Sequence, residues 1–288
     1  MTTDIETGAL AVPPAHTQRS PTYFAWRRFA ANKAAVIGGI VLAIIILAAI
    51  FAPLFTKSSP DAQLYLTQSL AFPSAEFWFG VDDLGRDFFT RIVYGARVSL
   101  LIGFAAATCS LLIGIPIGAI AGYFIEIFSV VPPLLATMLL GALTGGGYFT
   151  IIIIASAFGW FGVCLLVRAQ VKSFREKEFV RAAQALGASP WYILRRHVIP
   201  NSLSPIIVGF VLSVPGAMML EASLSFLGIG VAPPTPSWGQ MINVGINFMF
   251  FYWHMAVFPT AALAITVLAT TLFGDGLRDA LDPTLKGR

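Results

Sequence analysis

The chain has 288 residues, of which 57% are hydrophobic and 11% are charged, and its formal net charge is +4. A soluble domain usually has about 25% charged residues, so this chain has too few charges to cover a water-exposed surface. The composition therefore excludes a soluble globular protein and indicates an all-α polytopic membrane protein. A transmembrane β-barrel would show segments of alternating polarity about ten residues long, and the sequence has none.

The N-terminal part is predicted to contain a tail and one spanning helix. Residues 1–22 are rich in Pro, Thr and Ala and are expected to form a disordered cytoplasmic tail. Segment 23–95 is expected to hold the first transmembrane helix and an extracytoplasmic loop. The apolar run in it is not expected to be a cleaved signal peptide, because more than thirty residues precede it and no small-residue cleavage pattern follows.

Six apolar runs are predicted to cross the membrane, since a spanning helix needs roughly 20 mostly apolar residues. In chain order they are 34–55, 96–122, 128–145, 148–170, 203–228 and 250–274. The third is the weakest of these predictions because two adjacent prolines and four glycines crowd it. The last five spans form a predicted core over 96–276, and a cytoplasmic tail over 277–288 follows.

Lysines and arginines are distributed unevenly between the two sides of this topology. With six spans, three groups of basic residues lie on one side: four in the N-terminal tail, seven in 168–196 and three in the C-terminal tail. The other side has four: Lys57, Arg86, Arg91 and Arg97. Because cytoplasmic segments carry the excess of Lys and Arg, both termini are predicted to be cytoplasmic. This bias accounts for the net charge, so nucleic-acid binding is not needed to explain it.

The second span has three glycines at four-residue spacing, Gly114, Gly118 and Gly122. This spacing places small residues on one helix face, where another backbone can approach closely. Two partners are consistent with the pattern: another helix of this chain, or a helix of a partner subunit.

Glu221 is the one acidic residue deep inside an apolar run. An ionisable side chain is costly there, which favours a role for Glu221, with Ser225, in a translocation path or gate. The structural alternative is that Glu221 hydrogen-bonds to the nearby Ser223 or Ser225, or to loop backbone, near the far surface of the membrane. His254, in the last span, is expected to be a packing or interfacial residue rather than a ligand.

Motifs for catalysis or nucleotide binding are absent from the sequence. There is no GxxxxGK[ST] phosphate loop, no HExxH, no GxSxG, and no Cys pair at metal-ligand spacing. Cys109 and Cys164 lie in apolar runs and are expected to be small core residues. We therefore predict no catalytic residue, no metal site and no cofactor bound by this chain, which is expected not to be an enzyme.

A polar segment over 177–198 separates two of the most apolar runs. Its first half has an apolar helix face, with residues at i, i+3, i+4 and i+7: Phe179, Ala182, Ala183 and Leu186. Gly187 is a typical helix stop, and Ser189-Pro190 is a typical N-cap and first-turn pair for a second helix that runs to Val198. Pro200 is expected to end that second helix, after which Asn201 or Ser202 caps the next span. The spacing is consistent with either a helical elbow that docks in a groove of another protein or an amphipathic helix on the membrane surface.

Several stretches of the sequence resemble one family. "AAQALGASPWYILRRHVIPN" is similar to the EAA motif of permease subunits of ABC importers. "FGVDDLGRDFFTRIVYGARVSL", "EASLSFLGIGVAPPTPSWGQMI" and "GDGLRDALDP" resemble further signatures of the peptide/nickel branch, and 24–55 resembles the N-terminal segment of its C-type permeases. The resemblance extends over nearly all of 24–283.

This resemblance implies a type I importer permease fold, with an extra N-terminal helix before a five-helix core. The partners it implies are a homologous B-type permease, two cytosolic ATPases that bind ATP and Mg, and an extracytoplasmic peptide-binding protein. The implied location is the bacterial inner membrane, among its lipids. The implied cargo is a dipeptide or oligopeptide; a nickel chelate, glutathione or another small solute is the alternative. A secondary transporter is disfavoured because Glu221 is the one candidate coupling residue and no inverted repeat is visible.

The resemblance also assigns segment 177–198 as the loop that couples the permease to an ATPase. Its candidate contact and hinge residues are Phe179, Arg181, Ala182, Ala183, Leu186, Gly187, Ser189 and Pro190. Two departures from the family pattern stand out. Arg181 takes the place of the motif's first Glu, and the connection between 122–124 and the prolines of the third span is shorter than in the family.

Overall fold

The computed structural model describes residues 21–56, 58–120, 132–145 and 147–282. All regular secondary structure within these ranges is helical. The longer helices are α1 (Pro21–Ala31), α2 (Lys33–Ile50), α4 (Phe88–Ile120), α5 (Pro133–Thr144), α6 (Tyr148–Arg175), α7 (Glu178–Ala185), α10 (Leu203–Phe226), α11 (Trp238–Phe248) and α12 (His254–Leu281). Short helical turns are α3 (Ala52–Phe55), η1 (Leu66–Gln68), α8 (Pro190–Ile193), the π-helical turn η3 (Leu194–Val198) and α9 (Ile199–Asn201).

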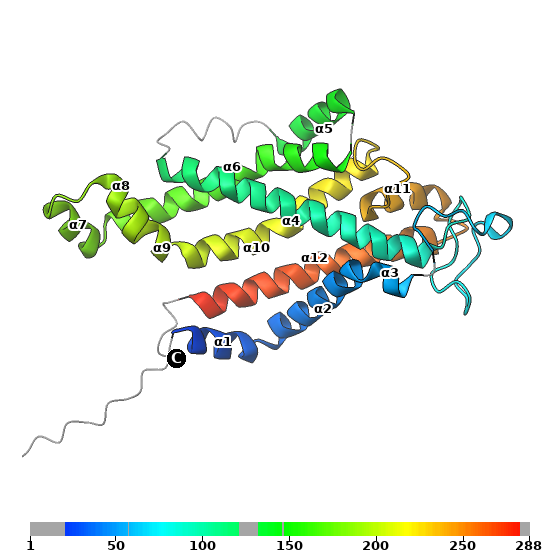
Figure 1. The fold of residues 1–288 in the computed structure, drawn as a ribbon, viewed down its shortest axis with the longest axis horizontal. Helices are drawn as coiled ribbons and strands as arrows, with labels where there is room; N and C mark the ends of the chain where they lie inside the picture. The colour runs from blue at the N-terminus through cyan, green and yellow to red at the C-terminus, as the bar shows by residue number, and fades with distance from the viewer. Residues whose placement is uncertain (1–20, 57, 121–131, 146, 283–288) are drawn as a thin grey trace, which may run out of the picture.

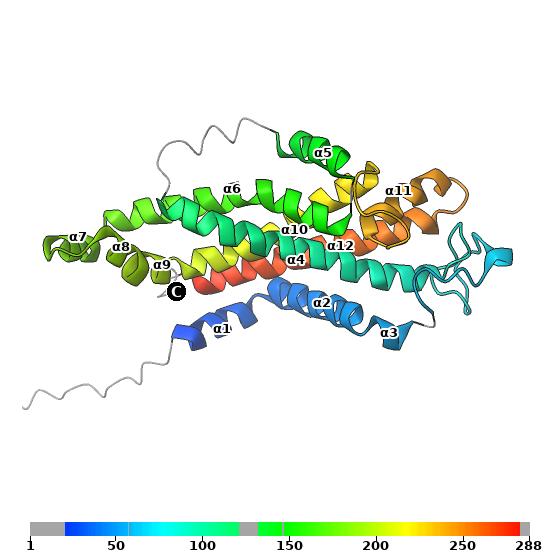
Figure 2. The same cartoon turned by 45° about the horizontal axis from the view of Figure 1, so that its top comes forward.

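Five helices of the described chain, α2, α4, α6, α10 and α12, are long and apolar enough to cross a membrane. They run side by side along the long axis of the molecule (Figures 1 and 2). The predicted all-α polytopic fold is thereby confirmed. Helix α5, in the weakly predicted third span, has 12 residues. Its length of about 18 Å is less than the hydrocarbon thickness of about 30 Å; residues 128–131 of that span lie outside the described ranges.

Helix α4 begins at Phe88, eight residues before the predicted span at 96. The reason is a polar cap: Asp87 Oδ2 accepts hydrogen bonds from the Thr90 amide at 2.8 Å and from the Thr90 hydroxyl at 2.6 Å. These bonds satisfy donors that a helix start otherwise leaves unpaired. Hydropathy misses the first two turns because they are not purely apolar.

The extra N-terminal helix α2 packs against α12 through small residues. A side chain at Gly38 would approach the Ala269 carbonyl oxygen to 2.7 Å, and one at Gly276 would collide with Ala35. Asn32 starts α2 by accepting a hydrogen bond from the Ala35 amide at 3.1 Å. Helix α12 continues past the predicted end at 274 to Leu281, and the glycines near that end lie close to α2 and α10.

Helix α11 lies between α10 and α12 at the end of the bundle opposite α7 (Figure 1). The predicted spans 203–228 and 250–274 leave this segment as a loop between them. Ser237 begins α11 by accepting a hydrogen bond from the Gln240 amide at 3.2 Å, and the Trp238 indole N–H donates to the Ile92 carbonyl at 3.0 Å. Eleven residues are too few for a span, so hydropathy gives no signal. The Ser-x-x-Gln pattern at 237–240 was a usable helix-start signal.

The stretch "VDDLGRD" at 81–87 forms a tight turn organised by Asp82. Its Oδ1 accepts hydrogen bonds from the amides of Leu84 and Arg86, both at 2.9 Å, and its Oδ2 lies 2.6 Å from Arg86 Nε. Arg91 is buried beside it, with Nε 3.5 Å from Asp82 Oδ2 and Nη1 3.0 Å from the Pro60 carbonyl. These contacts fasten the loop before α4 to the start of that helix.

Asp83, next in this turn, is expected to weaken the fold at neutral pH. Burial raises the pKa of its carboxyl, the adjacent Asp82 carboxylate raises it further, and Arg86 opposes both. The folded state therefore binds this proton more tightly than the unfolded state, so the ionised form costs stability above the raised pKa. That cost fades as pH falls toward the ordinary value of 3.8. Asp83→Asn should raise the thermal midpoint at neutral pH and give a much smaller gain near about pH 4.

Thermal unfolding of the detergent-solubilised protein across this pH range measures the Asp83 effect. Glu76→Gln, a change of the same kind at an exposed carboxylate of the same loop, is the control for a general effect of charge. An equal gain for Asp83→Asn at both pH values would contradict the assignment.

Candidate functional site

The segment after α6 folds into a helical elbow, which we define as residues 177–201, at one end of the bundle (Figures 1 and 2). The predicted stop is present: Gly187 has φ +82°, its amide donates to the Gln184 carbonyl at 2.9 Å, and the Ala188 amide donates to the Ala183 carbonyl at 3.0 Å. This is a Schellman end, which favours glycine. The predicted start is present as well, since Ser189 Oγ accepts a hydrogen bond from the Tyr192 amide at 3.3 Å, with Pro190 in the first turn.

A small hydrophobic cluster anchors the elbow to α6. Val180 of α7, Ile193 of α8 and Val198 of the π-helical turn are buried together, and they pack against Val171 and Phe174 of α6. The two short helices thus have a core of their own and a fixed attachment. The elbow is therefore a stiff projection of α6.

The outward face of α7 differs from the predicted face in one residue. Phe179 and Leu186 are 43% and 89% exposed, and Ala182 is also exposed. Ala183, expected on the same face, is half-buried and packs with Val180 in the elbow's own cluster. The residue spacing does not predict the burial of Ala183, because it does not show that Val180 is buried and that Ala183 lies on the same inward side of the helix. Arg181 is exposed.

The second helix of the elbow does not break at Pro200, contrary to the prediction. A π-helical turn at Leu194–Val198 leads directly into α9, which passes through Pro200 and ends at Asn201, one turn residue before α10. Proline has no amide hydrogen to donate, and the wider turn before it is a common way to keep a helix continuous. Ser202 occupies the predicted N-cap position of α10 but makes no side-chain cap, since its Oγ donates to the Val198 carbonyl at 2.8 Å, and the Asn201 side-chain amide donates to the His197 carbonyl at 2.6 Å.

Glu221 in α10 is fully buried, with 0% of its surface exposed. Its Oε1 accepts a hydrogen bond from the Ser225 hydroxyl at 2.8 Å, and its Oε2 accepts one from the Ser99 hydroxyl at 3.2 Å. Ser225 is the partner named in the structural alternative, whereas the Ser223 hydroxyl donates to the Met219 carbonyl. Ser99, which lies 122 residues away in the chain, was missed.

The same hydroxyls also accept backbone hydrogen bonds. The Val231 amide donates to Ser225 Oγ at 3.1 Å, and the Trp238 amide donates to Ser99 Oγ at 3.2 Å. Each hydroxyl has one proton, and here that proton is directed at Glu221. The carboxylate therefore joins α10, α4 and the start of α11, and no solute reaches it in this conformation.

The glycines of α4 face α6 of the same chain. A side chain at Gly114 would approach the Trp160 carbonyl oxygen to 2.7 Å, and one at Gly118 would approach the Cys164 carbonyl oxygen to 2.5 Å. At these two positions the close approach lies within the chain and not against a partner. Gly122 lies outside the described residues.

Two further expectations concern ligands. His254 is fully buried among the rings of Phe72 and Phe88, in a packing environment. In the described ranges, no group of three or more His, Cys, Asp or Glu side chains is placed to hold a metal ion.

Comparison with known proteins shows that this chain is similar to transport subunits. Residues 99–287 match the family described as binding-protein-dependent transport system inner membrane component, and residues 20–73 match the N-terminal TM domain of oligopeptide transport permease C. The oligopeptide transport system permease protein OppC of Bacillus subtilis is 42% identical over 270 residues, which cover 90% of this chain and 88% of that protein.

Two other relatives extend the comparison. The dipeptide transport system permease protein DppC of Bacillus subtilis is 40% identical over 279 residues, which cover 93% of this chain and 87% of that protein. The glutathione transport system permease protein GsiD of Pectobacterium atrosepticum is 35% identical over 279 residues, 93% of each chain.

Proposed function

The chain belongs to the family of binding-protein-dependent transport system inner membrane components, the permease subunits of ABC importers, and from this premise we propose that its cargo is a dipeptide or oligopeptide. The relatives named for oligopeptide and dipeptide transport, at 40–42% identity over about nine-tenths of the chain, support this cargo. Glutathione is the second candidate, supported by relatives at 35–36% identity.

The family implies a cytosolic ATPase and a substrate-binding protein as partners. Our proposal adds three finer points. The chain pairs with a homologous B-type permease, so that each forms half of the translocation path; one ATPase lies under each permease and binds ATP and Mg; and the complex resides in the bacterial inner membrane with both termini of this chain in the cytoplasm. The lipid-facing surfaces are the apolar outer faces of helices such as α2.

The observation that carries the coupling role is the elbow. A chain without a phosphate-binding loop must receive mechanical work from a partner that has one, and a stiff projection is suited to that task. The exposed face formed by Phe179, Ala182 and Leu186 is narrow at its centre, because the central residue, Ala182, has only a methyl side chain. We assign this face to a groove of the ATPase, whose closure tilts α6 and α10 together.

Transport by the reconstituted complex tests this function. The chain is purified with its B-type permease and ATPases, placed in proteoliposomes, and supplied with the binding protein loaded with labelled dipeptides, oligopeptides or glutathione. ATP-dependent accumulation of the dipeptides or oligopeptides is the expected result. Accumulation of glutathione alone would replace the proposed cargo, and accumulation without ATP would overturn the importer mechanism.

The proposed orientation makes a separate prediction. Ala232, in the loop before α11, and Ala185, in α7, are both exposed, and α11 and α7 lie at opposite ends of the bundle (Figure 1). Ala232→Cys should react in intact cells with a membrane-impermeant maleimide, because its loop faces outward. Ala185→Cys should react only after permeabilisation. The opposite labelling pattern would invert the topology and remove the elbow from the ATPase side.

A further inference from the structure

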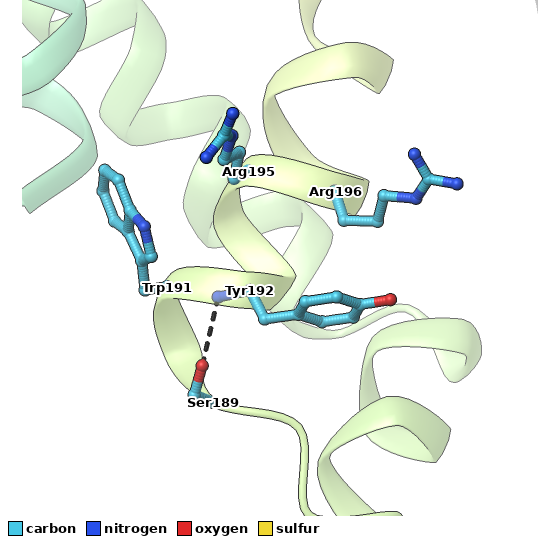
Figure 3. A pocket seen from close by; sticks show the side chains of 5 residues that line it. All are labelled: Ser189, Trp191, Tyr192, Arg195 and Arg196. Atoms are coloured by element: carbon cyan, nitrogen blue, oxygen red, sulfur yellow. Dashed lines mark hydrogen bonds between the residues drawn. The ribbon is translucent and has the colours of Figure 1, made fainter.

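A second surface of the elbow carries arginines and aromatic rings. We define the basic hollow as the open depression of about 540 Å³ lined by Ser189, Trp191, Tyr192, Arg195 and Arg196. In Figure 3, Arg196 extends alongside the Tyr192 ring, and Arg195 lies on the same side of the helix as Trp191. None of the lining residues is acidic.

The backbone that presents these side chains is well anchored. Ser189 and Pro190 start α8, and both arginines come from the π-helical turn that follows. The buried residues Ile193 and Val198 lie on either side of the two arginines in the chain and hold this turn against α6. The guanidinium groups therefore project from a fixed support, which reduces the entropy lost when they bind a partner.

The described part of the chain does not neutralise the charges of the hollow. Both arginines are exposed, and neither makes an ion pair with any residue that the structure describes. The Trp191 and Tyr192 rings beside them are 62% and 54% exposed. A guanidinium group fits a carboxylate through paired hydrogen bonds, and Arg, Trp and Tyr are the residues that most often dominate protein–protein binding energy.

The position of the hollow favours a protein partner over lipid. In both views α7 and α8 lie beyond the ends of α4 and α10, two of the five helices long enough to cross the bilayer, while the end of α6 reaches the elbow (Figures 1 and 2). A lipid headgroup would have to lie at the ends of those helices. The exposed Arg181 on the neighbouring helix α7, where the family motif has an acidic residue, adds to this charge: the elbow has four exposed basic residues, Lys177 among them, and one acidic residue, Glu178.

We propose that the basic hollow is a second docking site for the ATPase and receives acidic side chains from its surface. This inference rests on the proposed function, since it assumes that the elbow meets an ATPase. The narrow face of α7 fits the groove by shape, while Arg195 and Arg196 select by charge. A permease of this kind thereby distinguishes an ATPase with an acidic rim from one without it.

Retention of the ATPases by the detergent-purified complex tests the charge contact. Arg195→Gln/Arg196→Gln should weaken retention about tenfold at low ionic strength, because charge-assisted contacts are lost. Raising NaCl from about 0.01 M to about 1 M shortens the Debye length from about 30 Å to about 3 Å. The wild-type complex should lose ATPase over this range, whereas the double variant should show much less dependence on salt.

The matched control is Arg27→Gln/Lys33→Gln, which removes two exposed positive charges from α1 and α2. It should retain the ATPases as wild type does. Equal retention of the ATPases by the Arg195→Gln/Arg196→Gln variant would overturn the inference. If that variant keeps the ATPases but binds anionic vesicles less than wild type does, with binding to neutral vesicles unchanged, the hollow is assigned to lipid and the inference is likewise overturned. If Ala182→Trp releases the ATPases while the double variant keeps them, the elbow docks without the hollow, and only the further inference fails.

Discussion

Ala182→Trp is expected to abolish ATP-dependent uptake while the chain still inserts and pairs with the second permease. Ala182 lies at the centre of the exposed face of α7, between Phe179 and Leu186, and its side chain is absent from the elbow's own cluster. An indole at this position overfills a groove fitted to a methyl group, at a cost of about 1–3 kcal/mol. That cost corresponds to ATPase binding weakened by about fivefold to 150-fold.

Gln184→Trp is the matched control, because it places the same bulky side chain on the same helix, nearly opposite Ala182, at an exposed position. Co-purification of the ATPases and ATP hydrolysis stimulated by loaded binding protein are the two measurements. Full stimulation with Ala182→Trp, or equal loss with Gln184→Trp, would contradict docking through the exposed face of α7. Ala183→Trp is a poorer probe than spacing suggested, because the half-buried Ala183 would disrupt the elbow itself.

Glu221→Gln is expected to lower uptake strongly and to destabilise the contact between α10, α4 and α11. The carboxylate accepts hydrogen bonds from Ser225 and Ser99, and an amide presents N–H groups where one of those hydroxyl protons now points. A buried donor without an acceptor costs about 1–3 kcal/mol. The expected measurements are a lower thermal midpoint of the purified complex and a reduced rate of uptake with normal assembly.

Ser99→Ala distinguishes the two roles considered for Glu221. If the carboxylate acts by joining the helices, Ser99→Ala removes one of the same bonds and should reproduce part of both defects. If the charge acts on the solute in another conformation, Glu221→Gln should impair uptake while Ser99→Ala leaves it normal. Normal uptake and stability in Glu221→Gln would contradict both roles.

The sequence by itself determined the helical membrane fold, the positions of α2, α6 and α10, and the stop and start of the elbow. Each of these features is set by residues that are close together in the chain. A long apolar run must form a helix in the bilayer, because each backbone polar group needs a partner within the segment. Likewise, a left-handed helix end at Gly187 and the Ser189-Pro190 start follow from the conformations that these residues permit.

Only the tertiary structure decided which side of α7 faces outward, which residues hold Glu221, and that α11 exists. Val180 and Ala183 face inward because they pack against Phe174 of α6 and Ile193 of α8. Ser99 reaches Glu221 across 122 residues. Hydropathy and residue spacing report only on residues that are close together in the chain. These contacts form between helices that are distant in the chain, so a local sequence pattern does not predict them.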